Sequence, residues 1–163
     1  MNGLSISFFR QFEAACRSFD QSSDYMLFIT ADVVSQEWDS FFHYASKVLA
    51  IGSIGTFSPT LTHEWFHLGK NPFVFFDFGL PLSLVQCNDL IVAYINHDII
   101  LEMISYFDFF NAAKDTFDPI VGFGLMEVFT SIINSKNFVH VRDRSFTLRH
   151  PEGSSYDKKI AHE

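Results

Sequence analysis

The sequence predicts an α+β fold: one compact domain with about four to five helices around a small, largely antiparallel sheet. Helical stripes and short apolar runs are interspersed along the chain, without the regular strand–helix–strand alternation of α/β proteins. The chain has 163 residues, of which 48% are hydrophobic and 18% are charged, so it can bury one core. We assign residues 1–150 to this domain and the polar residues 151–163 to a flexible C-terminal tail.

The first fifty residues are predicted to form two helices with a strand between them. Apolar residues spaced three and four apart predict a helix from about residue 5 to residue 19. Residues 25–30 are a short apolar run that suits a buried strand. Ser35 is placed to cap a helix that continues to about Ala50, with its aromatic residues turned inward.

The second half of the chain is predicted to add short strands and two further helices. Residues 73–76 read as a strand, and residues 82–86 and 90–95 as two strands joined in a hairpin at Asn88-Asp89. Helices are expected over residues 98–113, with Asp98 as the cap, and over residues 119–133.

The last strands are expected in a closing hairpin. Val139 and Val141 alternate with polar residues, as do Phe146 and Leu148 beyond a turn at residues 143–145.

Residues 63–67 match the pattern H-E-x-x-H, the one short motif in the chain that indicates a specific catalytic chemistry. Ser58 is a suitable N-cap, Pro59 suits a first helical position and Gly69 is placed to end the segment, so we expect a short helix here. On such a helix His63 and His67 lie on one face. An amphipathic surface helix without a metal would give the same arrangement.

The motif predicts a zinc site if a third ligand exists. His63 and His67 would bind the metal, and Glu64 would act as general base on a zinc-bound water. The arrangement faintly resembles zinc peptidases whose third ligand is a glutamate on a later helix, which here implies Glu102, with His97 as the alternative. The chain departs from other zinc peptidases because no glycine-spaced third histidine follows His67. A zinc-dependent metallohydrolase is therefore the alternative function.

The acidic charge of the chain is concentrated in two regions. The formal net charge is −8. Residues 18–46 contain five acidic residues and no Lys or Arg, and residues 71–135 contain eight acidic residues and one lysine. Nucleic-acid binding needs a basic surface, so this distribution argues against it.

An acidic surface with aromatic anchors suits a basic protein partner. We therefore predict a non-enzymatic binding protein, an immunity-type antidote that covers the active site of a basic toxin such as a nuclease. Acidity that only keeps an apolar domain soluble would give the same composition. The residues expected to bind the partner are Asp77, Asp89, Asp98, Glu102, Asp108, Asp115 and Asp118.

Other features limit the remaining classes of function. No run of eighteen apolar residues and no signal-like leader is present, which predicts a cytoplasmic protein without a membrane partner. Two distant cysteines, Cys16 and Cys87, predict buried thiols and no disulfide. No cofactor other than zinc in the alternative is expected. The 21 phenylalanines are expected mostly in the core, and some could form the interface of a regulatory or structural homodimer, which is the third function considered.

Overall fold

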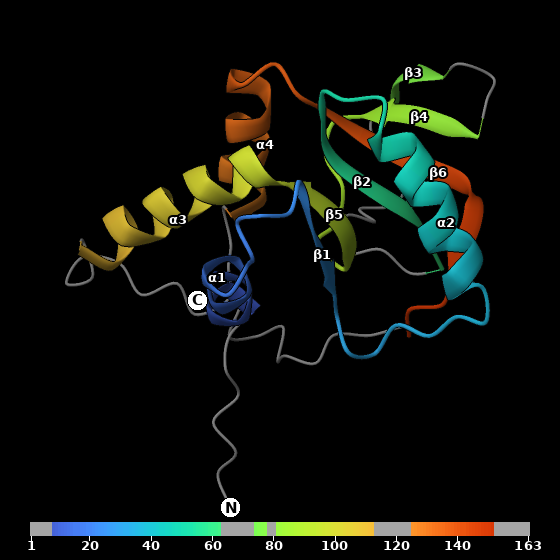
Figure 1. Ribbon diagram of the computed structural model, residues 1–163, viewed down its shortest axis with the longest axis horizontal. Helices are drawn as coiled ribbons and strands as arrows, with labels where there is room; N and C mark the ends of the chain where they lie inside the picture. The colour runs from blue at the N-terminus through green and yellow to red at the C-terminus, as the bar shows by residue number, and fades with distance from the viewer. Residues whose placement is uncertain (1–7, 63–73, 78–80, 113–124, 152–163) are drawn as a thin grey trace, which may run out of the picture.

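The computed structural model describes residues 8–62, 74–77, 81–112 and 125–151, and these form four helices and one six-stranded sheet (Figure 1). The α+β class is confirmed. The helices are α1 (Phe8–Arg17), α2 (Trp38–Leu49), α3 (His97–Ala112) and α4 (Leu125–Ser135). The strands are β1 (Tyr25–Ile29), β2 (Ile54–Leu61), β3 (Val74–Asp77), β4 (Leu82–Val85), β5 (Val92–Asn96) and β6 (Val139–Leu148).

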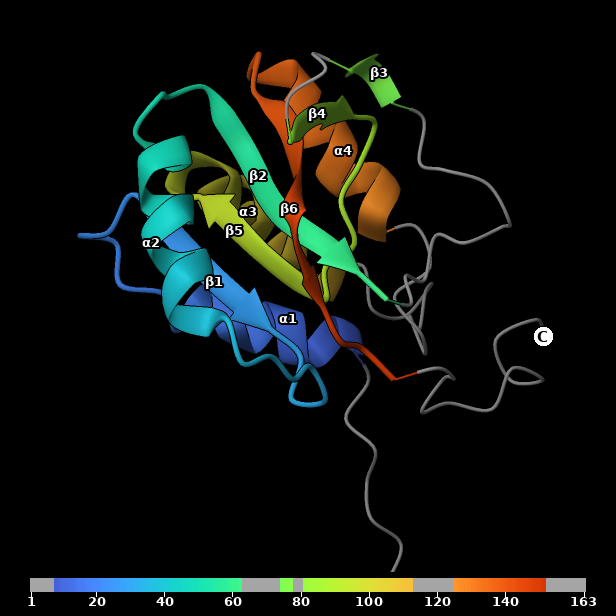
Figure 2. The ribbon, with the colours of Figure 1, turned by 90° about the vertical axis from the view of Figure 1, so that its right-hand side faces the viewer.

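The sheet is mixed, with the strand order β1-β5-β2-β6-β4-β3. Strands β2 and β6 run parallel at its centre, and the other four pairings are antiparallel. Figure 2 shows β2 and β6 side by side, with β5 and β1 beyond β2. The last strand in the sequence is therefore a central strand of the sheet.

Both faces of the sheet are covered by helices, which makes three layers. Alternation along β5 shows the division: Ala93 and Ile95 belong to the core beneath α1, α3 and α4, whereas Val92 and Tyr94 face α2. The α2 layer contains Phe41, which is fully buried and stacks on Phe57 of β2 with ring centroids 6.0 Å apart.

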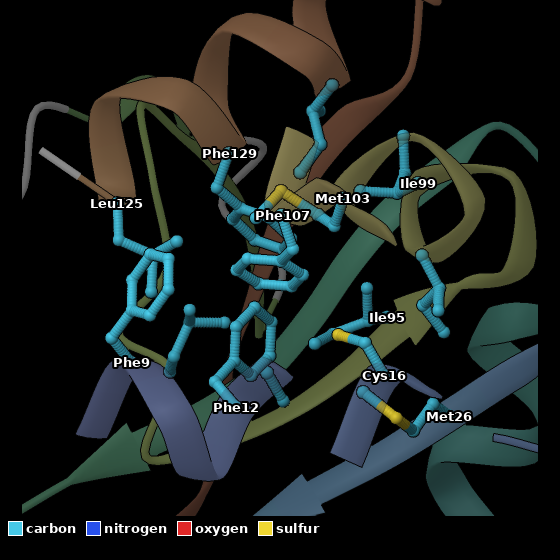
Figure 3. Close-up of a cluster of buried hydrophobic side chains, with 14 residues drawn as sticks. Phe9, Phe12, Cys16, Met26, Ile95, Ile99, Met103, Phe107, Leu125 and Phe129 are labelled. Carbon is cyan, nitrogen blue, oxygen red and sulfur yellow. The ribbon is translucent and has the colours of Figure 1, made fainter. Parts of the chain in front are cut away.

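The larger core is built from aromatic side chains of three helices. Figure 3 shows Phe9 and Phe12 rising from α1 toward Phe107 of α3 and Phe129 of α4. The rings of Phe9 and Phe107 meet edge to face at 5.1 Å, a favourable geometry for aromatic pairs. Cys16 lies in the same core, as predicted, and burial raises the pKa of its thiol to about 12.

Two predicted helix starts are displaced along the chain. The α2 helix begins at Trp38, because the Ser35 hydroxyl accepts the N–H of Glu37 in a turn that precedes the helix. In α3 the capping side chain is Asn96, which accepts the N–H of Asp98 at 2.9 Å. The helix predicted over residues 119–133 corresponds to α4, and its first six residues lie outside the described part.

The predicted hairpin between residues 82–86 and 90–95 is wrong. Strand β4 pairs with β3 and β6, and β5 pairs with β1 and β2. The connection between β4 and β5 passes β6 and β2, and Asn88 within it is fully buried. Its amide donates to Thr56 Oγ1 and to the carbonyl of Val141. Asn88 therefore ties the connection to the central strands and does not form a hairpin turn.

The predicted closing hairpin is also wrong, because residues 139–148 are the single strand β6. Its pairing with β2 jumps from Pro59–Asp143 to Thr60–Thr147, so the residues between form a bulge. The Asp143 carboxylate accepts the N–H groups of Ser145 and Phe146 within this bulge. The chain does bend locally at residues 143–145, as the sequence indicated, but the same strand continues beyond the bend to Leu148.

The start of the helix predicted for the H-E-x-x-H segment is wrong as well. Ser58 and Pro59 lie in β2, and Ser58 is 3% exposed. Pro59 has no N–H to donate, and it lies where the pairing with β6 shifts register, a position in a sheet where proline is tolerated. Residues 63–69 lie outside the described part of the chain.

Candidate functional site

One side of α3 is exposed to solvent. The opposite side of this helix is buried through residues Ile99, Ile100, Met103 and Phe107. With 100° per residue, the seven exposed residues of α3 share its other side and define the outer face of α3. These residues are Asp98, Leu101, Glu102, Ser105, Asp108, Phe109 and Ala112.

One end of this face is acidic. Asp98 and Glu102 are exposed one turn apart, and the carbonyl of the exposed Asp24 accepts the N–H of His97 at 2.8 Å. We call Asp24, Asp98 and Glu102 the acidic end of α3. Acidic side chains are favoured at a helix N-terminus, so this placement also stabilises α3.

A single lysine partly neutralises the acidic end. Lys136, just beyond α4, places its Nζ 2.8 Å from Glu102 Oε1. The pKa of Lys136 is raised by its hydrogen bond to Glu102 and by the charges of Glu102 and Asp98. Asp98 and Glu102 therefore share one ammonium group, so within the described residues the acidic end keeps an excess of negative charge.

The other end of α3 is held to α1 by a polar network around Glu13. The carboxylate of Glu13 is 8% exposed and accepts hydrogen bonds from Arg10 at 2.6 Å, Asn111 at 2.8 Å and Arg17 at 3.0 Å. Arg17 also pairs with Asp108 at 2.7 Å. Burial acts to raise the pKa of Glu13, but the hydrogen bonds from Arg10, Asn111 and Arg17 outweigh it and lower the pKa.

Phe109 lies on the outer face beside this network. Its side chain is 72% exposed, whereas Phe107 two residues earlier is fully buried. We call Arg17, Asp108 and Phe109 the charge-balanced end of α3, because it presents one exposed cation, one exposed carboxylate and one exposed aromatic ring.

Three of the predicted partner-binding residues lie together on α3. Asp98 and Glu102 belong to its acidic end, and Asp108 is the carboxylate of its charge-balanced end, with a side chain 64% exposed. All three residues therefore lie on the same exposed helix. The distribution of acidic residues over positions 71–135 did not distinguish this helix from its neighbours.

The other four are placed differently. Asp89 is 4% exposed, so its carboxylate presents almost no surface to a partner. Asp77 lies in β3, an edge strand. Asp115 and Asp118 lie outside the described residues.

The predicted zinc ligands His63 and His67 and the predicted base Glu64 also lie outside the described residues. Within the part that the structure describes, no three His, Cys, Asp or Glu side chains are grouped so that they could hold a metal ion. Of the predicted third ligands, Glu102 is paired with Lys136, and the ring of His97 packs against Phe19 at 5.9 Å.

Two buried histidines acquire partners that the sequence did not reveal. His140 Nδ1 lies 2.7 Å from Thr56 Oγ1, which also accepts the amide of Asn88 at 3.0 Å. Which of the two groups donates depends on the tautomer of the imidazole, and the buried Nε2 has no hydrogen-bond partner among the described residues. Burial lowers the pKa of His140 to about 4.

His150 is the second buried histidine. Its ring Nε2 lies 3.5 Å from the Asp32 carboxylate, and its backbone N–H donates to Thr62 Oγ1 at 3.0 Å. The hydroxyl of Thr62 donates in turn to the His150 carbonyl at 2.9 Å. Asp32 and His150 are 118 positions apart, so nothing in their local sequence indicates this pair.

Comparison with known protein families finds no match for this chain, and no curated protein sequence matches it. In the described part of the chain, no helix has both the length and the apolar character needed to cross a membrane.

Proposed function

We propose that this protein is a non-enzymatic binding protein, an immunity-type antidote that neutralises a basic toxin such as a nuclease by covering its active site. The observation that carries the proposal is the acidic end of α3. There Asp98 and Glu102 stand exposed on a helix whose opposite side is anchored in the core.

A nuclease holds phosphates with basic side chains, so an acidic surface complements its active-site groove. Complementary fields accelerate encounter and disfavour wrong partners, and they are weakened by salt. Leu101, which is 38% exposed, offers an apolar contact beside the two carboxylates. Buried apolar anchors surrounded by polar residues are the usual arrangement of a stable protein interface.

The proposal is tested with the product of a neighbouring toxin-like reading frame as the partner. Binding is measured by surface plasmon resonance at low and moderate salt, and inhibition by the toxin's own activity. In the double variant Asp98→Lys, Glu102→Lys we expect affinity to fall about 100-fold, mostly through slower association, because two attractive charges become repulsive.

A matched control carries the same change of charge elsewhere. Glu37 and Asp39 are both exposed at the start of α2, on the other side of the sheet from α3. The variant Glu37→Lys, Asp39→Lys should change affinity less than about threefold if α3 is the contact. No binding of the wild-type chain at either salt concentration would reject the proposed function, and equal losses in both variants would reject the role of α3.

One observation supports the zinc-hydrolase alternative. Thr62, directly before His63 in the chain, is hydrogen-bonded to the backbone of His150, and the imidazole of His150 lies beside a carboxylate. Carboxylate–histidine pairs are common around zinc sites. The alternative predicts about one zinc per chain after purification without a metal-binding tag. Zinc content that is equal in the wild type and a His63→Ala, His67→Ala variant rejects it.

A further inference from the structure

The charge-balanced end of α3 has the features of a contact between identical chains. Phe109 is 72% exposed, although it adjoins a cluster of aromatic rings. Its neighbour Phe110 packs on Phe9 at 5.2 Å and on Tyr106 at 6.1 Å. Figure 1 shows the C-terminal half of α3 extending away from the sheet. The ring therefore stands on a projecting helix, where a second molecule can reach it.

The charges around Phe109 remove the main obstacle to self-association. Two copies of a chain with a net charge of −8 repel each other over most of their surface. Near Phe109, however, Arg10 and Arg17 balance Glu13 and Asp108. This neutral region lies about 16 Å along the helix from Asp98, because an α-helix rises 1.5 Å per residue.

The same region is self-complementary. In a twofold dimer each surface meets its own copy, so a cation and an anion beside an apolar centre can pair reciprocally. Arg17 and Asp108 are 38% and 64% exposed, so each can form a second contact besides the pair within its own chain. The network around Glu13 fixes α1 and α3 relative to each other, which lowers the entropy lost on association.

We infer that the charge-balanced end of α3 binds a second copy of this chain. Phe109 of each copy packs at the centre of the contact, and Arg17 of each copy faces Asp108 of the other. This assigns a surface to the homodimer and leaves the acidic end of α3 open for a basic partner. The inference does not depend on the proposed function.

The first test measures the mass of the full chain by sedimentation equilibrium over a range of concentrations. We expect a monomer–dimer equilibrium for the wild type and a shift to monomer of at least about tenfold in Kd for Phe109→Ser. The matched control is Leu101→Ser, two turns away on the outer face of α3, which should leave the Kd unchanged. A wild type that stays monomeric up to about 1 mM, or equal effects of both substitutions, overturns the inference.

A second test separates contacts between chains from the contact within one chain. Asp108→Arg leaves two cations beside Phe109, and Arg17→Glu leaves two carboxylates. Each variant alone should be monomeric, and an equimolar mixture should form a heterodimer, because only the mixture pairs opposite charges. Thermal unfolding verifies that both variants are folded. If the Arg17→Glu variant does not fold, because its new carboxylate lies beside Glu13, the comparison of Phe109→Ser with Leu101→Ser still tests the inference. No association in a mixture of two folded variants contradicts the inference.

Discussion

At the scale of single residues, Gly55 shows how closely α4 packs on the sheet. A Cβ at this position would lie 2.9 Å from Ile133 Cγ2 and 3.0 Å from Phe138 Cβ. We expect Gly55→Ala to lower the free energy of unfolding by about 1–3 kcal/mol, because the end of α4 must move away. Urea denaturation at constant m-value measures the loss.

The control for Gly55 is Gly52, where glycine is required by the backbone conformation and not by close packing. Gly52 has φ of +84° and no atom within 4 Å of an added Cβ. Gly52→Ala should therefore cost only the left-handed backbone conformation, about 1 kcal/mol. A larger loss at Gly52 than at Gly55 would show that packing against α4 is not the tighter constraint.

His140 predicts how stability changes between pH 7 and pH 4. Its pKa in the folded chain is lowered by burial to about 4, against 6.5 when exposed. As pH falls below 6.5, the unfolded chain takes up a proton that the folded chain rejects, so stability decreases until pH 4 is reached. The full loss is about 3 kcal/mol for a shift of this size.

The variant His140→Gln tests this assignment. It removes the titrating group and keeps a side-chain amide, which can either donate to or accept from the Thr56 hydroxyl. Chemical denaturation at half-unit steps should show a shallower decline between pH 6.5 and pH 4.5 in the variant than in the wild type. If stability declines equally with pH in the variant and the wild type, the loss of stability does not come from the lowered pKa of His140.

His140 also shows a limit of sequence reasoning about single residues. The alternation of Val139 and Val141 with polar residues predicts a strand, but it does not indicate that His140 is 3% exposed, with the ring of Phe129 at 6.1 Å. Alternation shows which residues share a face of a strand. It does not show whether a helix such as α4, from a different part of the sequence, covers that face.

At the scale of elements, Glu13 joins α1 to α3. We expect Glu13→Ala to lower the free energy of unfolding by about 1–2 kcal/mol, because Asn111 and the two arginines lose their common acceptor, while water still reaches the arginine side chains, which are 36% and 38% exposed. Thermal and urea unfolding measure the effect. Glu127→Ala, an exposed glutamate in the first turn of α4, is the control and should cost less than about 0.5 kcal/mol. Equal losses would contradict a structural role for the network.

Helices and strands were predictable where the pattern is local, and strand pairings were not. The stripe at spacings of three and four locates α1, and the apolar run over residues 25–30 locates β1. Strand β4 pairs with β6, which follows it by more than fifty residues, and β5 pairs with β1 and β2, which precede it. A hairpin is the default for neighbouring strands, and only the buried hydrogen bonds of Asn88 reveal the crossing connection.

The sequence predicted that the candidate site is acidic, but it predicted only part of the positions that form it. An excess of acidic residues over residues 71–135 indicates a charged surface, and Asp98, Glu102 and Asp108 do lie on one helix. Asp89 is equally acidic in sequence but buried. Whether a carboxylate is exposed depends on the tertiary packing of its segment, which residue type does not encode.

At the scale of the whole molecule, the topology predicts which part of the chain opens last. Strand β6 is the last of the described strands in the sequence, yet it lies between β2 and β4 and completes the centre of the sheet. Strands β1 and β3 are the edges, each with one neighbour. Amide hydrogen exchange reports local opening, and central strands covered on both faces open mainly through global unfolding.

We therefore expect the slowest amide exchange in the hydrogen-bonded residues of β2 and β5 and in residues 139–143 of β6. Exchange in β1 should be faster, because among the described strands it has β5 as a neighbour on one side and none on the other. Ser145 and Phe146 in the bulge should also exchange faster than residues 139–143, since their N–H groups donate to the Asp143 carboxylate and not to a neighbouring strand. Mass spectrometry of peptic fragments resolves these segments. If residues 139–143 exchange faster than β1, then β6 does not close the sheet cooperatively, and the chain unfolds from its C-terminal strand first.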